Sequence, residues 1–191
     1  MLAGGVGYGK MRDSIKGTPK AGEKVVVLGG DNYRIGMGGG AVSSVETGQY
    51  SNAIELNAVQ RANPEMQKRA ANVIRALAES DNNPIVSIHD HGAGGHLNCL
   101  SELVEATGGK IDMDALPIGD KTLSDKEIIG NESQERMGLL VGEEHLDHIQ
   151  KIADRERSPM YVVGETTGDM QFVFEHKNGT CPINMPLDYM F

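Results

Sequence analysis

A strand that opens into a glycine loop and then into a helix constrains the fold of this chain more than any other feature. The strand is expected over 84–88 and leads through His89-Asp90-His91 into Gly92-Ala93-Gly94-Gly95, and the helix is expected over 97–106. Such a loop presents several backbone N–H groups with few side chains in the way, which suits a phosphate or a metal–phosphate complex. The feature therefore predicts a strand, loop and helix unit that binds an anion.

The rest of the chain alternates between strand-like and helix-like segments. Short apolar or β-branched runs predict strands over 24–28, 110–114, 137–141, 161–164 and 170–175. Capping residues and helical periodicity predict helices over 64–80, from 124 onwards and over 143–157. This alternation predicts a mixed sheet covered by helices. We expect residues 1–191 to form one domain, with an incomplete first edge over 1–22.

The composition argues against several classes of partner. The 191 residues carry a net charge of −9, whereas a nucleic-acid partner would need a clustered Lys/Arg surface. No apolar stretch approaches the roughly 20 residues of a membrane span, and the N-terminus lacks a secretory pattern, so we expect a cytoplasmic chain without membrane contact. Cys99 and Cys181 predict neither a zinc motif nor a disulfide. Cys99 is expected in the core.

A second glycine run has several interpretations. The residues Gly36-Met37-Gly38-Gly39-Gly40-Ala41 loosely fit the dinucleotide fingerprint, but no acidic ribose partner follows on a recognisable second strand. A tight turn with close backbone packing fits the run better. Contact with a phosphate or another anion is the remaining interpretation.

The histidines around the first glycine loop invite a metal-site interpretation. His89, Asp90, His91 and His96 are all residue types that bind first-row metals. Side chains alternate along a strand, however, so His89 and His91 would point away from Asp90. Asp90 alone, beside a phosphate, is the better candidate, because magnesium commonly takes only one or two protein carboxylates.

A polar segment, Asn131-Glu132-Ser133-Gln134-Glu135-Arg136, runs straight into the apolar strand expected over 137–141. One interpretation is a solvated strand end, since polar runs usually face water. The other is that the Ser133 hydroxyl and the Gln134 amide orient a polar substrate through directional hydrogen bonds. The residue types alone leave both interpretations open.

Five short blocks follow one another along the chain: 38–44 (GGGAVSS), 59–66 (VQRANPEM), 89–95 (HDHGAGG), 131–136 (NESQER) and 155–159 (RERSP). Together they resemble the formylglycinamide ribonucleotide amidotransferase family, also called phosphoribosylformylglycinamidine synthase, in its large single-chain form. The matching region is a C-terminal-type domain of the aminoimidazole ribonucleotide (AIR) synthetase superfamily. The resemblance implies an α+β fold, a three-layer α/β/α domain with a mixed sheet and a partly ferredoxin-like topology.

The resemblance also implies a set of site residues. The expected substrate contacts are Gln60, Glu132, Ser133 and Gln134. The expected phosphate-loop residues are Gly92, Gly94 and Gly95. Asp90 matches the magnesium-binding aspartate of the family. His91 and His96 depart from the family pattern and are interpreted as local variation, without a ligand role.

The activity implied by the resemblance is a step of purine synthesis. ATP activates the amide oxygen of formylglycinamide ribonucleotide, and ammonia from glutamine displaces the phosphate to give the amidine. The expected cofactors are Mg²⁺ and ATP, with ATP bound mainly by domains outside this chain. Expected partners are the ribonucleotide, the remaining synthetase and glutaminase domains, and a second copy of the chain. Residues 1–191 alone would then be inactive.

Two alternatives to this activity remain at this stage. The chain could belong to another ATP-dependent enzyme of the superfamily, such as AIR synthetase, selenophosphate synthetase or thiamin-phosphate kinase. The block at 131–136 argues against that alternative. The chain could also be a structural half of a pseudo-symmetric assembly that binds no ligand.

Overall fold

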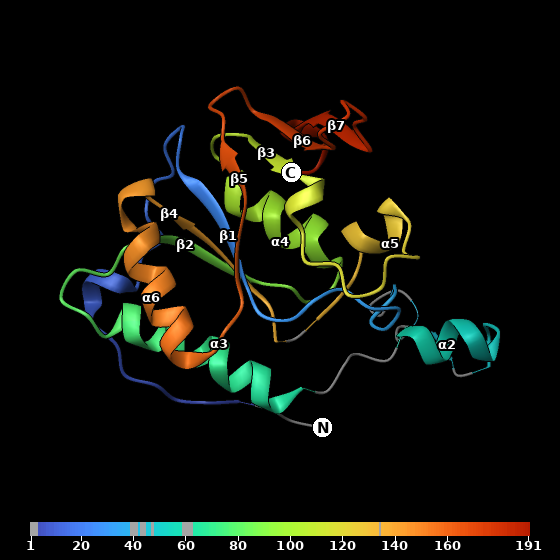
Figure 1. Cartoon of the computed structure of the whole chain (residues 1–191), viewed down its shortest axis with the longest axis horizontal. Coiled ribbons are helices and arrows are strands. Elements are labelled where there is room, and N and C mark those ends of the chain that lie inside the picture. The colour runs from blue at the N-terminus through green and yellow to red at the C-terminus, as the bar shows by residue number, and fades with distance from the viewer. Residues whose placement is uncertain (1–3, 39–41, 43–44, 47, 59–62, 134) are drawn as a thin grey trace.

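A seven-stranded mixed sheet is the centre of the computed structural model, which describes residues 4–38, 42, 45–46, 48–58, 63–133 and 135–191 (Figure 1). The strands are β1 (Lys24–Leu28), β2 (Ile85–Asp90), β3 (Gly109–Asp112), β4 (Met137–Val141), β5 (Met160–Thr166), β6 (Gln171–Glu175) and β7 (Ile183–Pro186). They lie in the order β2-β4-β1-β5-β3-β6-β7. Strands β3 and β6 pair in parallel, and the other neighbours pair antiparallel.

Helices cover both faces of the sheet, so the fold has three layers (Figure 1). Helices α3 (Pro64–Ala78) and α6 (Leu146–Glu156) pack on one face. Helices α4 (Gly95–Val104) and α5 (Asp125–Ile129) pack on the other. Helix α2 (Asn52–Ala58) stands apart from the sheet, at the right of Figure 1, and none of its residues is buried. The short 3₁₀ helices are Met11–Asp13, Met113–Ala115, Glu143–His145 and Leu187–Tyr189.

Strand β1 lies in the interior of the sheet and is buried on both faces. Val25 and Val27 belong to the core beneath α4 and α5, whereas Val26 and Leu28 belong to the core beneath α3 and α6. A strand covered on both faces needs an apolar side chain at every position, because successive side chains point to opposite faces. This requirement explains the unbroken apolar run over 25–28.

The starts of two helices follow from their capping residues. The Asn63 side chain accepts a hydrogen bond from the Met66 backbone N–H (3.0 Å), and Pro64 occupies the first turn of α3, where its missing N–H costs nothing. Helix α5 begins with a capping box, in which the Glu127 carboxylate accepts a hydrogen bond from the Ser124 backbone N–H (2.8 Å).

The predicted α+β fold with a mixed sheet covered by helices is confirmed, and the predicted strands over 24–28 and 137–141 have the predicted bounds. The strand expected over 84–88 instead begins at Ile85 and continues to Asp90, and the following helix begins at Gly95 instead of 97. Strand β7 and helix α2 were not predicted. Cys99 lies in the core as expected, with 1% of its surface exposed.

The N-terminal segment lies against one edge of the sheet. The backbone N–H of Gly17 donates to the carbonyl oxygen of Val86 in the edge strand β2 (2.9 Å). The Lys10 ammonium donates to the carbonyl oxygens of Glu79 and Ser80, at the end of α3 (both 3.2 Å). In the described part of the chain, no helix is both long and apolar enough to span a membrane.

Candidate functional site

Three loops meet at one end of the sheet. They follow β1, follow β2 and precede β4, and they lie close together because Met137 pairs with both Leu28 and Asp90. Backbone hydrogen bonds join them: the Glu132 N–H donates to the Gly36 carbonyl oxygen (2.9 Å), and the Ser133 N–H donates to the His91 carbonyl oxygen (3.0 Å). The glycine loop and the polar block that are far apart in sequence are therefore neighbours.

Glycine is required where these loops cross. Gly95 has a φ of +58°, and a Cβ there would lie 2.5 Å from the Asn131 carbonyl oxygen. Gly36 has a φ of +74°, and a Cβ there would meet the carbonyl oxygen of Glu132. This close approach supports the backbone-packing interpretation of the second glycine run, whose Gly39, Gly40 and Ala41 lie outside the described residues.

The amides of the phosphate loop are partly engaged within the protein. The Gly94 N–H donates to the Glu132 carboxylate (3.2 Å), and the Gly95 N–H donates to the Gly92 carbonyl oxygen (3.0 Å). Gly94 also has a φ of +83°, which favours glycine. These three glycines thus shape the loop at the start of α4, and their contact with a phosphate stays a prediction.

Asp90 ends strand β2 with its side chain exposed. No hydrogen bond or ion pair to its carboxylate is found within the described part of the chain. A Cβ on Gly92 would lie 2.7 Å from the Asp90 Oδ2, so glycine at that position leaves the carboxylate accessible. An exposed carboxylate oxygen beside a glycine loop fits a hard cation such as Mg²⁺, which binds proteins through one or two carboxylates.

The neighbouring histidines are not arranged as a metal cluster. His89 Nδ1 lies 2.8 Å from the carboxylate of Glu102, in α4. His91 and His96 are fully buried, whereas Asp90 is exposed. Among the described residues, no group of three or more histidine, cysteine, aspartate or glutamate side chains is placed to hold a metal ion.

The described residues of the polar block before β4 are buried, and its interpretation as a solvated strand end is therefore wrong. Glu132 and Ser133 are 3% and 1% exposed. Their placement depends on the backbone bonds to the other two loops, which leave the segment inside the protein. Gln60 and Gln134, the other expected substrate contacts, lie outside the described residues. A direct substrate contact by any of the four stays a prediction.

A buried polar network lies beneath the three loops. Arg136 is fully buried, and its Nη2 donates to the carbonyl oxygen (2.7 Å) and the Oδ1 (2.6 Å) of Asn131. Its Nη1 donates to Asn32 Oδ1 and lies 2.7 Å from His96 Nε2. His96 Nδ1 in turn lies 2.9 Å from His91 Nε2. A buried charge is tolerated only when it is hydrogen-bonded, so Arg136 needs these partners. Because the partners come from all three loops, the network joins the loops.

The environment of this network keeps its two imidazoles neutral. Burial lowers the pKa of both His91 and His96 well below the usual histidine value, and the adjacent Arg136 guanidinium lowers both further. Sequence reasoning did not assign Asn32 or Arg136 to the site and treated the two histidines as local variation. Nothing in the residue pattern distinguishes a buried arginine from the exposed arginines that are far more common.

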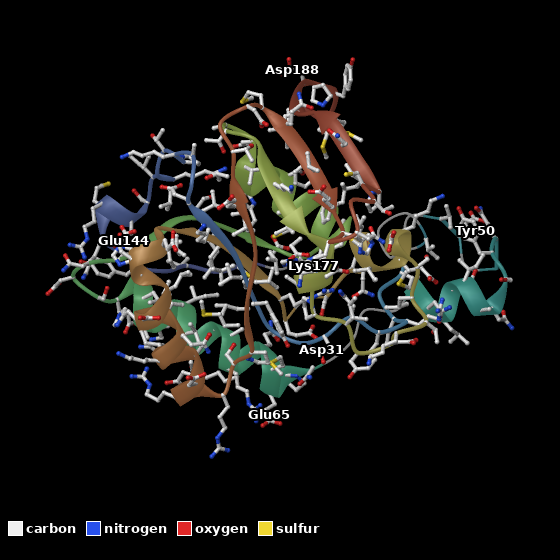
Figure 2. All side chains as sticks on the ribbon, turned by 45° about the horizontal axis from the view of Figure 1, so that its top comes forward. Asp31, Tyr50, Glu65, Glu144, Lys177 and Asp188 are labelled. Carbon is white, nitrogen blue, oxygen red and sulfur yellow. The ribbon has the colours of Figure 1, made fainter. Side chains whose placement is uncertain are left out.

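One further contact fixes the loop after β1. The Tyr161 hydroxyl donates to the Asp31 carboxylate (2.8 Å), and Figure 2 shows Asp31 among the loops at this end of the sheet. Burial and this hydrogen bond raise the pKa of Tyr161 to about 12. The phenol is therefore a hydrogen-bond donor at neutral pH.

Residues 20–177 match the family described as AIR synthase related protein, C-terminal domain. The chain belongs to this family. The match includes all three loops of the site, together with strands β1 to β6. The predicted relation to the AIR synthetase superfamily is thereby confirmed.

Curated relatives have long chains of which this domain is a small part. A Dictyostelium discoideum protein named phosphoribosylformylglycinamidine synthase is 44% identical over 192 aligned positions, which cover 98% of this chain and 14% of that protein. A Schizosaccharomyces pombe protein of the same name is 40% identical and covers 100% of this chain and 15% of its own. The chain thus spans about one seventh of the length of these relatives.

Solved structures share the fold of this AIR synthase-related domain. A structure of Thermotoga maritima PurL complexed with FGAR matches 92% of this chain and 29% of that chain, with a TM-score of 0.81 and 24% identity. Escherichia coli HypE matches 91% of this chain and 53% of its own, with a TM-score of 0.59 and 13% identity. The likeness confirms the α+β three-layer fold expected for the superfamily.

Proposed function

We propose that this chain is one domain of a phosphoribosylformylglycinamidine synthase. The supporting observation is the 40 to 44% identity to relatives of that name over nearly all of this chain. The whole enzyme would use ATP to activate the amide oxygen of formylglycinamide ribonucleotide and ammonia from glutamine to displace the phosphate. Residues 1–191 would contribute substrate and magnesium contacts and would be inactive alone, since the remaining synthetase and glutaminase domains lie outside them.

Asp90 is the proposed magnesium ligand. Its exposed carboxylate terminates β2, next to the glycine loop, and is not engaged by another described residue. Bound Mg²⁺ would screen the negative charge of a phosphate during its transfer. Asp90 itself would supply a hard oxygen ligand at the end of a strand.

The two neighbouring segments are proposed to bind the substrate. The loop of Gly92, Gly94 and Gly95 would bring its backbone close to a phosphate oxygen, because glycines place few side-chain atoms in the way. Gln60 and Gln134 would contact the ribonucleotide through their amides. Glu132 and Ser133 are the other two proposed substrate contacts, and because both are buried they would also hold the loop in place beside Gln134.

The proposal also includes ATP binding, a cytoplasmic location and pairing of the domain with a second copy. ATP binding is supported by the name of one PurL structure, "complexed with ATP", which shares 22% identity and a TM-score of 0.71 with this chain. ATP would be held mainly by other domains. A cytoplasmic location and pairing with a second copy of the domain remain parts of the proposal.

The test is an ADP-release assay of the full-length protein that contains this chain, supplied with ATP, Mg²⁺, glutamine and formylglycinamide ribonucleotide. ADP release should require the ribonucleotide. Asp90→Asn should reduce kcat/KM by at least about a hundredfold, because a metal supplies several kcal/mol of charge stabilisation in the transition state. ADP release that does not require the ribonucleotide would mean that the enzyme acts on another substrate of the superfamily.

The matched control is Asp188→Asn. Asp188 is also an exposed aspartate, but it follows β7, at the opposite edge of the sheet from β2, and Figure 2 shows it far from Asp31. Its replacement removes the same charge and should leave kcat/KM within about twofold, as expected for a surface substitution away from the site. Equal losses in the two variants would contradict the role of Asp90, and no loss in either would favour a structural domain.

A further inference from the structure

The geometry fixes which group donates and which accepts in each hydrogen bond of the buried network beneath the three loops. An arginine guanidinium can only donate hydrogen bonds. Arg136 Nη1 lies 2.7 Å from His96 Nε2, and the Asn32 side-chain amide nitrogen lies 3.1 Å from the same atom. Asn32 Oδ1 accepts from Arg136, so its amide nitrogen faces His96 as a donor. His96 Nε2 is therefore an acceptor and carries no proton.

The same reasoning fixes the donor and the acceptor between His96 and His91. A neutral imidazole without a proton on Nε2 carries it on Nδ1. His96 Nδ1–H therefore donates to His91 Nε2, 2.9 Å away, and His91 must in turn carry its proton on Nδ1. The two rings meet edge to face, with an interplanar angle of 87°, which allows an N–H on one ring edge to point at a nitrogen of the other.

We infer that Arg136, His96 and His91 are positioning residues, joined by hydrogen bonds in one direction, which hold the glycine loop against the polar block before β4. This inference rests on the proposed function. The chain of bonds begins at the guanidinium, passes through His96 and ends at His91. None of the three touches substrate in this scheme, because all three are fully buried.

The way these residues act on the loops follows from their backbone contacts. The His91 N–H donates to the Arg136 carbonyl oxygen (3.2 Å), and the His91 carbonyl oxygen accepts from the Ser133 N–H (3.0 Å). His91 is thus bound on both sides to the segment before β4. His91 lies between Asp90 and Gly92, so a shift of its backbone would displace both the proposed metal ligand and the loop.

The same network reaches the third loop through Asn131. Its side-chain amide donates to the carbonyl oxygens of Tyr33 (2.8 Å) and Ile35 (2.7 Å), while its Oδ1 accepts from Arg136. Arg136 is thereby linked to the loop after β1 as well as to the glycine loop. A single buried cation therefore sets the relative placement of segments that would have to meet around a ligand.

The first test needs no substrate. The tautomers of His91 and His96 are measured by long-range ¹H–¹⁵N spectroscopy of the 191-residue chain at neutral pH, with assignments from single histidine variants. Both rings should show a proton on Nδ1 and none on Nε2, whereas free histidine in water favours the opposite tautomer. A proton on Nε2 of either ring would overturn the direction of the hydrogen bonds.

The second test separates positioning from folding by steady-state kinetics of the full-length protein. His96→Leu removes the hydrogen bonds of the ring to Arg136, Asn32 and His91. KM for formylglycinamide ribonucleotide should then rise about tenfold, the lower end of the effect of losing a supporting contact. The amide of His96→Gln can still accept a hydrogen bond from Arg136 and donate one to His91. KM of this variant should therefore be close to that of the unaltered protein and well below that of His96→Leu. His148→Leu, at an exposed position of α6, is the matched control and should leave KM unchanged.

The outcomes are distinguishable. A purely structural role of His96 would lower the fraction of active enzyme, so kcat would fall at constant KM in His96→Leu, and the inference would be overturned. A His96→Leu protein that fails to fold leaves the tautomer measurement on the unaltered chain as the deciding result. Predicted tautomers together with a full-length protein that does not use the ribonucleotide would refute the proposed function but not the hydrogen-bond chain.

Discussion

Gly95→Ala should destabilise the domain because two separate costs act at this position. The φ of +58° places an alanine in the left-handed region, which costs an L-residue about 1–2 kcal/mol. The new methyl group would also lie 2.5 Å from the Asn131 carbonyl oxygen, a backbone atom that cannot rotate away. Relief of such a contact by backbone shifts costs about 1–3 kcal/mol. The expected loss is therefore about 2–5 kcal/mol.

Gly179→Ala is the matched control for this substitution. Gly179 also has a positive φ, +85°, but a Cβ there would meet nothing within 4 Å. Its replacement should cost only the backbone strain of about 1–2 kcal/mol. Both variants make the unfolded chain stiffer to the same extent, so that effect cancels in the comparison. The difference between the two variants isolates the contact with Asn131.

The assay is urea unfolding of the 191-residue chain and the two variants, followed by circular dichroism and analysed with a common slope. The free energy of unfolding should fall by about 1–3 kcal/mol more in Gly95→Ala than in Gly179→Ala, as the clash adds to the shared backbone strain. Complete loss of the cooperative transition in Gly95→Ala alone would point the same way. Equal losses in the two variants would refute the argument that the loops cross too closely for any side chain.

Two further predictions concern titratable groups. The pKa of His176 is raised, chiefly by its hydrogen bond to Asp114 (2.8 Å) and further by Asp125, so its contribution to stability should be complete below the ordinary histidine pKa and disappear as the pH rises through the raised value. His176→Gln should remove this part of the pH dependence in urea unfolding. Burial raises the pKa of Cys99, whereas Cys181 is exposed, so a thiol reagent should modify only Cys181 in the folded chain.

Each of these two predictions has a contradicting result. An unchanged pH dependence of unfolding in His176→Gln would mean that the two carboxylates do not stabilise the imidazolium. Rapid modification of Cys99 in the folded chain, measured by mass spectrometry, would mean that the core around α4 opens on the time scale of the reaction.

The elements that were predicted from the sequence are those whose burial leaves a repeating pattern. Residues 25–28 are apolar without interruption because both faces of β1 are covered, and that run identifies the strand. Strand β7 escaped prediction because Ile183–Pro186 is short, lies at the edge of the sheet and contains a proline and a polar residue. Helix α2 has no buried residue and hence no apolar stripe to recognise.

The candidate site was only partly predictable for a different reason. Asp90 and the glycines could be proposed from the sequence because a loop between a strand and a helix is a local feature. Arg136 was not, because its partners His96 and Asn32 are 40 and 104 residues away along the chain. A side chain that is buried by distant loops has no local signature, and the usual assumption that charged residues face water gives the wrong answer here.

The pairing of β1 also has a consequence for how the protein is made. Strand β1 leaves the ribosome first among the strands, yet its two neighbours, β4 and β5, follow only after more than a hundred residues. At usual rates of synthesis that interval lasts roughly 5–20 seconds. During this time an apolar, β-branched segment is exposed without its partners, in the kind of state that favours aggregation. A chaperone that recognises short apolar segments would therefore find its target at residues 24–28 of the nascent chain.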